Sequence, residues 1–217
     1  MSKIRVLLAD DHTILRVGLR SFLGYYDDIQ VVGEAQDGAA AVALVKELQP
    51  DVVLMDIAMP GVNGIQATRL IHEQRPETKV LILSQYEDPQ YVLPLLRAGA
   101  SGYILKDALG TDLLTAIRVV ANGETFLSPS VAKILAEEIR QSTNSKSVPH
   151  SSLTPREHQI LKHIAAGQTN AQIAAALVIS ENTVAWHRAN LMDKLGVHSV
   201  VGLVRYAMQH GLVEETW

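Results

Sequence analysis

Five short apolar runs, spaced along the first half of the chain, limit its fold more than any other feature. They are IRVLLA (4–9), IQVVGE (29–34), VVLMD (52–56), KVLILS (79–84) and GYILK (102–106). The first, third and fourth runs are almost continuously apolar, which is typical of strands covered on both faces of a parallel sheet. The segments between the runs carry apolar residues at helical spacing, as in Leu15, Leu19 and Phe22. This alternation predicts an α/β domain over 1–125 with a doubly wound, five-stranded parallel sheet.

A linker is expected after this domain. The alternation stops at Asn122-Gly123, and residues 128–141 then have the pattern of a single helix. The next stretch, 141–152, has Val148 as its one large apolar residue, which is too little to pack against a core. We therefore expect a linker helix and a flexible tether over 126–150.

The last part of the chain has helical patterns only. They cover 154–165, 170–177, 181–195 and 199–210. The second and third of them, joined at ISEN (179–182), have the lengths of a helix-turn-helix, which places its second helix in the major groove of DNA. Ser180 is expected to cap that second helix. The sequence thus predicts a small all-α domain with a helix-turn-helix over 151–217.

Composition and charge exclude several classes of protein. The chain has 217 residues, of which 47% are hydrophobic, and it has no cysteine, so disulfides and cysteine-ligated metals are excluded. Residues 1–125 hold 11 Lys and Arg against 16 Asp and Glu, and residues 151–217 hold 5 of each. Neither part has the strong basic charge that indicates nucleic-acid binding by itself. The chain shows no signal peptide and no membrane-spanning segment, so we expect a cytoplasmic protein.

Polar residues stand at the ends of four of the expected strands. Asp10 and Asp11 follow the first strand, and Asp56 ends the third. Ser84 ends the fourth strand, and Lys106 ends the fifth. Because the carboxyl ends of parallel strands lie at one edge of the sheet, these side chains should meet there. Three carboxylates repel one another, and Mg²⁺ relieves that repulsion while it accepts phosphate oxygens. The sequence therefore predicts a phosphoryl-transfer site with a nucleophilic carboxylate.

This set of residues, with DIAMPGVNG running on from Asp56, resembles the receiver domain of bacterial two-component response regulators. The resemblance implies that Asp56 accepts a phosphoryl group from a sensor histidine kinase. It implies that Asp10 and Asp11 hold Mg²⁺, together with Asp56 and the backbone carbonyl of Ala58.

The same resemblance implies a conformational switch. Ser84 and Lys106 would contact the phosphoryl oxygens, and Tyr103 would change its rotamer together with Ser84. The sequence departs from many receivers at Asp107, where those proteins have a proline after the lysine.

The stretch from Leu153 to Val197 resembles the LuxR-type DNA-binding domain almost throughout. A receiver followed by this domain is the arrangement of the NarL/FixJ family of response regulators. The implied function is that of a transcription factor and not an enzyme. Phosphorylation would control homodimerisation and binding to promoter DNA, and RNA polymerase is a further candidate partner.

The helix expected over 181–195 would contact DNA with the face opposite to Val184 and Leu191. The candidate DNA-contacting residues are Asn170, Asn182, Thr183, Ala185, Trp186, Arg188, Ala189 and Lys194. The role of Trp186 stays open between contact with bases and packing, either inside the protein or at a dimer interface. His187 is expected to be structural, and Glu157 is expected to pair with an arginine in the core.

Other functions compete with this one. A nucleotide or flavin binder of similar fold is disfavoured because no G-x-G-x-x-G follows the first strand. A phosphotransfer enzyme of the aspartyl-phosphate type needs a substrate-binding cap, for which the helical domain has no suitable carboxylate pair or nucleophile. A regulator that binds proteins, with a helix-turn-helix that no longer reads DNA, remains the alternative, since Ala185 and Ala189 leave the outward helix face without a cation.

Overall fold

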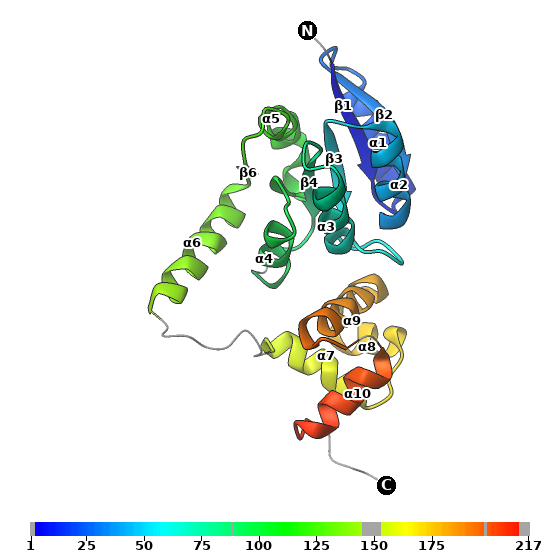
Figure 1. The fold of residues 1–217 in the computed structure, drawn as a ribbon, viewed down its shortest axis with the longest axis vertical. Coiled ribbons are helices and arrows are strands. Elements are labelled where there is room, and N and C mark those ends of the chain that lie inside the picture. The colour runs from blue at the N-terminus through cyan, green and yellow to red at the C-terminus, as the bar shows by residue number, and fades with distance from the viewer. Residues whose placement is uncertain (1–2, 88, 145–152, 198, 213–217) are drawn as a thin grey trace. The chain divides into compact units, whose positions relative to one another are not determined.

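The computed structural model describes residues 3–87, 89–144, 153–197 and 199–212, with most of their side chains. The chain forms two compact units, Met1–Asn144 and Ser145–Trp217. The first unit is α/β and the second is helical (Figure 1). Within the described ranges, no helix combines the length and the apolar character needed to cross a membrane.

A parallel sheet forms the middle of the first unit. Its strands are β1 (Ile4–Ala9), β2 (Ile29–Ala35), β3 (Val52–Asp56), β4 (Lys79–Ser84), β5 (Gly102–Leu105) and β6 (Phe126–Leu127). They lie in the order β2-β1-β3-β4-β5-β6, and every neighbouring pair is parallel. The predicted fold class is confirmed, with one short strand more than expected. From β1 the chain first continues to β2 on one side and then crosses to β3 on the other side. Sheets of this kind bind ligands at the carboxyl ends of the two strands where the direction switches, here β1 and β3.

Helices cover both faces of the sheet. They are α1 (Thr13–Leu23), α2 (Gly38–Leu48), α3 (Gly64–Gln74), α4 (Pro89–Arg97) and α5 (Leu109–Ala121), with a 3-10 helix η1 (Lys106–Ala108) before α5. On one face Leu19 of α1 and Ile117 of α5 pack in a cluster with Leu54 of β3. Alternate strand residues point to the opposite face, and Val53 and Ile82 are buried there as well. On that face α2 and α3 contact the strands, and α4 contacts α3.

The sixth strand attaches the segment after α5 to the sheet. In β6, Phe126 pairs with Gly102 of β5, and the backbone N–H of Ser128 donates a hydrogen bond of 3.1 Å to the carbonyl oxygen of Tyr103. A Cβ at Gly102 would lie 2.9 Å from the carbonyl oxygen of Phe126, so the close pairing depends on glycine at this position.

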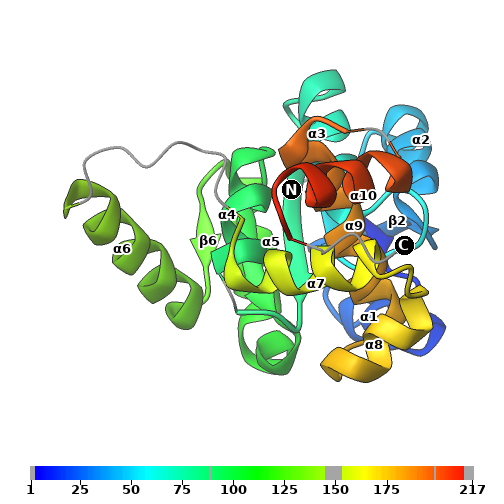
Figure 2. The same ribbon diagram turned by 90° about the horizontal axis from the view of Figure 1, so that it is seen from below.

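The linker helix α6 (Pro129–Asn144) follows β6 and contacts α4. Figure 2 shows α6 at the edge of the first unit, beyond β6. Residues 141–144 are helical, although their composition is typical of a tether, so the helix ends later than expected. The remaining part of the expected tether, 145–152, lies outside the described residues.

The described residues of the second unit form four helices. They are α7 (Pro155–Ala165), α8 (Asn170–Leu177), α9 (Glu181–Leu195) and α10 (Val200–Gln209), and all four were expected from the sequence. Capping boxes at Thr154 and Thr169 begin α7 and α8. Ser180 Oγ accepts a hydrogen bond of 3.0 Å from the backbone N–H of Thr183, which makes Ser180 the predicted cap of α9. The core contains buried residues of each helix, among them Ile160, Ile173, Leu191 and Leu203.

Candidate functional site

Two buried acids lie next to each other at the carboxyl edge of the sheet. Asp10 directly follows β1, and Asp56 ends the neighbouring strand β3. Their exposed fractions are 2% and 4%. Asp11 is half-buried beside them, and one carboxylate oxygen from each of the three lies within 4.8 Å of the others. The structure thus brings the three carboxylates together, while their roles remain predictions.

Lys106, the first residue of η1, contacts two of these acids. Its Nζ lies 2.8 Å from Oδ2 of Asp10 and 3.1 Å from Oδ1 of Asp56. Burial by itself lowers the pKa of Lys106, but Asp56 and Asp10 outweigh that effect, so its pKa lies above the ordinary value and the lysine stays charged. Burial also raises the pKa of Asp56, by more than the attraction of Lys106 lowers it. One lysine therefore does not compensate the buried carboxylates fully.

One carboxylate oxygen of Asp56 has no hydrogen-bond partner among the described residues. Its Oδ2 is buried, and no hydrogen-bond donor in the described part of the chain reaches it. A buried carboxylate oxygen without a partner is costly unless a ligand supplies one. The neighbouring groups that could bind a metal are carboxylate oxygens of Asp10 and Asp11, and Mg²⁺ prefers such oxygen ligands. The residues present therefore fit a divalent cation, with Asp56 Oδ2 available to it or to an incoming phosphoryl group.

Close backbone packing shapes the loop after Asp56. Helix α3 begins at Gly64, whose N–H donates a hydrogen bond of 3.0 Å to the carbonyl oxygen of Ile57. A Cβ on Gly64 would clash with the carbonyl oxygen of Asp56, so the helix can approach the strand only with glycine here. Ala58, whose carbonyl the receiver resemblance makes a metal ligand, is half-buried in this loop.

The predicted switch residues lie around the loop between β4 and α4. Ser84 ends β4, is buried, and accepts a hydrogen bond of 2.9 Å from the backbone N–H of Tyr86. Tyr103 is buried, and its hydroxyl donates a hydrogen bond of 2.6 Å to the carbonyl oxygen of Tyr86. Burial holds the pKa of Tyr103 well above its usual range, so it remains a neutral donor. The ring of Tyr86 stacks on Tyr91 of α4, with centroids 4.4 Å apart.

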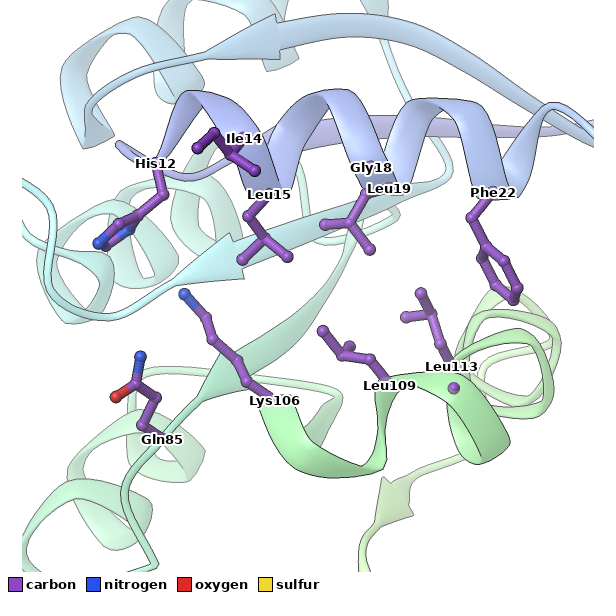
Figure 3. A pocket seen from close by; sticks show the side chains of 11 residues that line it. His12, Ile14, Leu15, Gly18, Leu19, Phe22, Gln85, Lys106, Leu109 and Leu113 are labelled. Atoms are coloured by element: carbon purple, nitrogen blue, oxygen red, sulfur yellow. The ribbon is translucent and has the colours of Figure 1, made fainter.

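A groove of about 590 Å³ opens beside the acids, between α1 and α5. Figure 3 shows the polar ends of His12, Gln85 and Lys106 gathered at one end of it. The rest of the groove is lined mainly by apolar side chains, namely Ile14, Leu15, Leu19, Phe22, Leu109 and Leu113. Ile14 is 89% exposed, so this side of the site presents an apolar surface to solvent.

Arg16 of α1 holds the backbone that carries the acids. Its Nη1 donates a hydrogen bond of 2.6 Å to the carbonyl oxygen of Asp10, and its Nε lies 3.3 Å from Oε2 of Glu34 in β2. Arg16 was not predicted as a site residue, because a cation on an amphipathic helix is expected to face water. The one available signal was its place beside Leu15, on the border of the apolar stripe.

In the second unit the candidate DNA contacts of α9 differ in accessibility. Ala185 is exposed and Ala189 is half-buried, whereas Thr183 and Trp186 are buried. The side chain of Asn182 lies outside the described residues. The assignment of these residues to DNA therefore remains a prediction.

Two cations expected to contact DNA have partners within the protein. Lys194 Nζ lies 2.7 Å from Oε2 of Glu157. The expected arginine partner of Glu157 was therefore wrong, because α9 brings a lysine to it instead. Arg188 donates a hydrogen bond of 3.2 Å to the carbonyl oxygen of Gln168, and burial lowers its pKa. Asn170 begins α8, and no donor among the described residues reaches its Oδ1.

His187 lies inside the second unit, as expected of a structural residue. It is 1% exposed, and its ring packs edge to face against that of Trp186, with centroids 4.7 Å apart. Burial, helped by the charge of Arg156, lowers the pKa of His187 from 6.5 to about 4. The imidazole is therefore neutral at neutral pH.

Both halves of the chain match known families. Residues 6–118 match the response regulator receiver domain, and residues 151–207 match the bacterial regulatory proteins of the luxR family. The oxygen regulatory protein NreC of Staphylococcus aureus strain MRSA252 is 42% identical over 216 residues, which cover 97% of this chain and 100% of NreC. NreC of Staphylococcus carnosus strain TM300 is 40% identical with the same coverage.

Solved structures lead to the same family. The response regulator ChrA of a heme-sensing two-component system is 38% identical, with a TM-score of 0.54 over 98% of this chain and 100% of ChrA. RcsB from Salmonella enterica serovar Typhimurium, bound to the promoter P1flhDC, is 29% identical, with a TM-score of 0.61 over 94% of this chain and 98% of RcsB. The chain therefore belongs to the NarL/FixJ family of response regulators, in which a receiver domain precedes a LuxR-type helix-turn-helix DNA-binding domain.

Proposed function

We propose that a sensor histidine kinase phosphorylates this chain on Asp56, and that the phosphoryl group controls dimerisation and sequence-specific DNA binding. The observation that carries the proposal is the environment of Asp56. Its buried Oδ2 has no donor among the described residues, while Lys106 lies 3.1 Å from its Oδ1. The proposal assigns 1–125 to the receiver, 126–150 to the linker and 151–217 to DNA binding.

In the proposed reaction Asp56 Oδ2 is the nucleophile. It attacks the phosphorus of a phosphohistidine, so that a P–O bond forms while the P–N bond breaks and the imidazole leaves with the bonding electrons. Lys106 would contact the phosphoryl oxygens, and its contact with the other oxygen of the same carboxylate supports this role. Asp10, Asp11, Asp56 and the carbonyl of Ala58 would hold Mg²⁺, which supplies positive charge to the transferring group.

The charge added by phosphorylation, roughly -2 at neutral pH, is the proposed switch signal. Ser84 would turn toward the phosphoryl group and give up its hydrogen bond from Tyr86, and Tyr103 would follow. Because Tyr86 stacks on Tyr91 of α4, and α4 contacts the linker helix α6, a change in this loop can reach the linker.

For the output we propose that α9 enters the major groove of promoter DNA. Support comes from relatives whose structures are described as RcsB bound to the promoter P1flhDC in the presence of phosphomimetic BeF3⁻, and as RcsB dimers bound to DNA. The chain would then act in the cytoplasm as a transcription factor and not as an enzyme. NreC is an oxygen regulatory protein and ChrA belongs to a heme-sensing two-component system, so these relatives differ in stimulus.

Selection from random DNA, followed by affinity measurement, tests this proposal. The full-length chain, treated with a small phosphodonor and Mg²⁺, should enrich one sequence motif. Phosphorylation should raise the affinity for that motif by on the order of tenfold, a typical coupling between two sites. The Asp56→Asn variant should show no such increase. Failure to enrich any motif, or an equal increase in Asp56→Asn, would contradict the proposal.

A second candidate function has one observation in its favour. The outward residues Ala185 and Ala189 carry no charge, and Lys194 and Arg188 have partners within the protein. A regulator that binds another protein through this surface would need no cations there. Salt dependence separates the two functions, because DNA binding releases counterions and protein binding through an uncharged face does not. A slope near zero of log affinity against log salt would favour the protein partner.

A further inference from the structure

The imidazole of His12 lies between two acids of the proposed metal site. Its Nδ1 is 2.9 Å from Oδ1 of Asp11 and 3.0 Å from Oδ1 of Asp10. The backbone N–H of His12 also donates a hydrogen bond of 2.7 Å to the same Asp10 oxygen, which fixes the residue beside the acid pair. The ring nitrogen is therefore in contact with an oxygen of each of these two acids.

Asp56, whose Oδ2 accepts no hydrogen bond from the described residues, is the fourth member of this cluster. One ligand atom each from Asp10, Asp11, His12 and Asp56 can be chosen so that all four lie within 4.8 Å of one another. The Asp56 side chain is 6% exposed, and its Oδ2 has no donor within the described ranges. This buried, unpartnered oxygen is a second sign, separate from the grouping of acids, that the cluster receives a ligand.

The distances around His12 match those of a coordination shell. Two neighbouring ligands of an octahedral ion with bonds of about 2.1 Å lie about 3.0 Å apart. The distances from His12 Nδ1 to Asp11 and Asp10 are 2.9 and 3.0 Å, so Nδ1 has the spacing of an adjacent ligand to each of these two oxygens. Coordination through Nδ1 needs the tautomer with its hydrogen on Nε2. The ring permits this because the side chain is 58% exposed to water.

We propose that His12 is a ligand of the divalent cation at this site. The site then has a mixed donor set of carboxylate oxygens and one imidazole nitrogen, which accepts first-row transition ions as well as Mg²⁺. Imidazole is a good ligand for such ions and a poor one for Mg²⁺, which prefers oxygen. His12 would therefore set the metal preference of this receiver. The inference rests on the proposed function, because it assumes that the acids bind a cation.

The competing role for His12 is that of a placeholder. In that role the ring donates a hydrogen bond to the acids in the metal-free protein and swings into water when a cation enters. The two roles make different predictions for metal binding when His12 is removed. Removal of a placeholder raises the affinity for Mg²⁺, whereas removal of a ligand lowers the affinity for ions that accept nitrogen.

Mn²⁺ is the probe for the decisive experiment, because it is paramagnetic and accepts both oxygen and nitrogen ligands. Pulsed electron paramagnetic resonance of the full-length chain with Mn²⁺ should show coupling to a directly bound ¹⁴N nucleus. Labelling of histidine with ¹⁵N should replace this ¹⁴N coupling by a coupling to ¹⁵N. The His12→Ala variant should lose it, while His210→Ala, which removes an exposed histidine of the second unit, should keep it.

Titration calorimetry supplies the second measurement. His12→Ala should weaken Mn²⁺ binding by about tenfold, in the range seen when a group that supports a metal site is removed. Mg²⁺ binding should change much less. Absence of bound ¹⁴N in the wild type would overturn the inference, as would tighter Mg²⁺ binding with unchanged Mn²⁺ binding in His12→Ala.

Asp11→Asn separates a failure of this inference from a failure of the proposed function. If the acids form the metal site, Asp11→Asn loses most of its Mn²⁺ affinity. Mn²⁺ binding that needs Asp11 but shows no nitrogen coupling would reject His12 as a ligand and leave the proposed function intact. Mn²⁺ binding that is unchanged in Asp11→Asn would reject the proposed metal site itself.

Discussion

The hydroxyl of Tyr103 donates a hydrogen bond of 2.6 Å to the backbone carbonyl of Tyr86. This bond connects strand β5 to the loop whose N–H is bonded to Ser84. Replacement of Tyr103 by phenylalanine removes the bond and leaves the ring in place. We expect phosphorylation of Asp56 by a small phosphodonor to proceed as in the wild type, because the hydroxyl that is removed is bonded to the backbone of Tyr86.

The same variant should lose part of the coupling between phosphorylation and DNA binding. The free energy of unfolding should fall by about 1 kcal/mol, the usual contribution of one hydrogen bond. Affinity for DNA with and without the phosphodonor measures the coupling. Full coupling in Tyr103→Phe would show that the hydroxyl does not take part in the switch.

Arg16 and Arg20 offer a matched pair of substitutions, because both guanidinium groups contact Glu34. Arg16 is buried and also bonds the carbonyl of Asp10, whereas the side chain of Arg20 is 62% exposed. Replacement of Arg16 by methionine leaves buried polar groups without a partner and should cost about 3–5 kcal/mol of unfolding free energy. The same change at Arg20 should cost less than about 1 kcal/mol.

Urea unfolding followed by circular dichroism measures both variants. Arg16→Met should also weaken Mg²⁺ binding, since Asp10 loses the contact that fixes its backbone. Equal losses of stability at the two positions would mean that the contact between Arg16 and Asp10 contributes little.

Val178 adopts a left-handed backbone conformation with φ of 55°, at the end of α8. This conformation is strained for a β-branched residue, and the side chain is 91% exposed, so it gains little from packing. Val178→Gly should raise the free energy of unfolding of the second unit by about 1 kcal/mol. Val178→Ala removes the branch and keeps the Cβ, so it should give a smaller gain.

Tryptophan fluorescence follows this unfolding, because both tryptophans, Trp186 and Trp217, belong to the second unit. A glycine variant that is no more stable than the wild type would show that the backbone of Val178 is not strained.

The buried His187 predicts acid sensitivity of the second unit. Its pKa is about 4 in the folded state and 6.5 when unfolded, so the unfolded chain binds the extra proton first as the pH falls. The contribution of His187 to stability is present above pH 6.5 and is lost between 6.5 and about 4, by up to about 3 kcal/mol. Unfolding by urea at pH 7 and pH 5, followed by tryptophan fluorescence, measures the loss.

A His187→Gln variant serves as the control, since it keeps a polar side chain and cannot titrate. It should lose less stability than the wild type between the two pH values. An equal loss in both proteins would assign the acid sensitivity to other groups.

The parts of the fold that the sequence predicted are those with long local signals. Each of the first five strands has at least four residues, enough for its apolar residues to be visible without knowledge of its neighbours, although in β2 only Ile29 and Ala35 are buried. Once the strands are known to be parallel, Asp10 and Asp56 must lie at the same edge. The two residues of β6, Phe126 and Leu127, are too few to show a pattern, so that strand could not be predicted.

Contacts between distant residues were the parts that could not be predicted. Glu157 pairs with Lys194, which is 37 residues away, because α7 and α9 pack together. The sequence shows that both are charged but not which helices cross. Arg16 was missed for the same reason, since its partners Asp10 and Glu34 lie on two strands that only the folded sheet brings together.

The central claim is that Asp56 is the residue that accepts the phosphoryl group. Intact-mass spectrometry after treatment with a small phosphodonor and Mg²⁺ tests it most directly. The wild type and Asp107→Asn, which removes an exposed acid next to Lys106, should each gain the mass of one phosphoryl group, and Asp56→Asn should gain none. Borohydride trapping and peptide mapping should place the group on Asp56. A phosphoryl group of the same stoichiometry on Asp56→Asn would contradict the account.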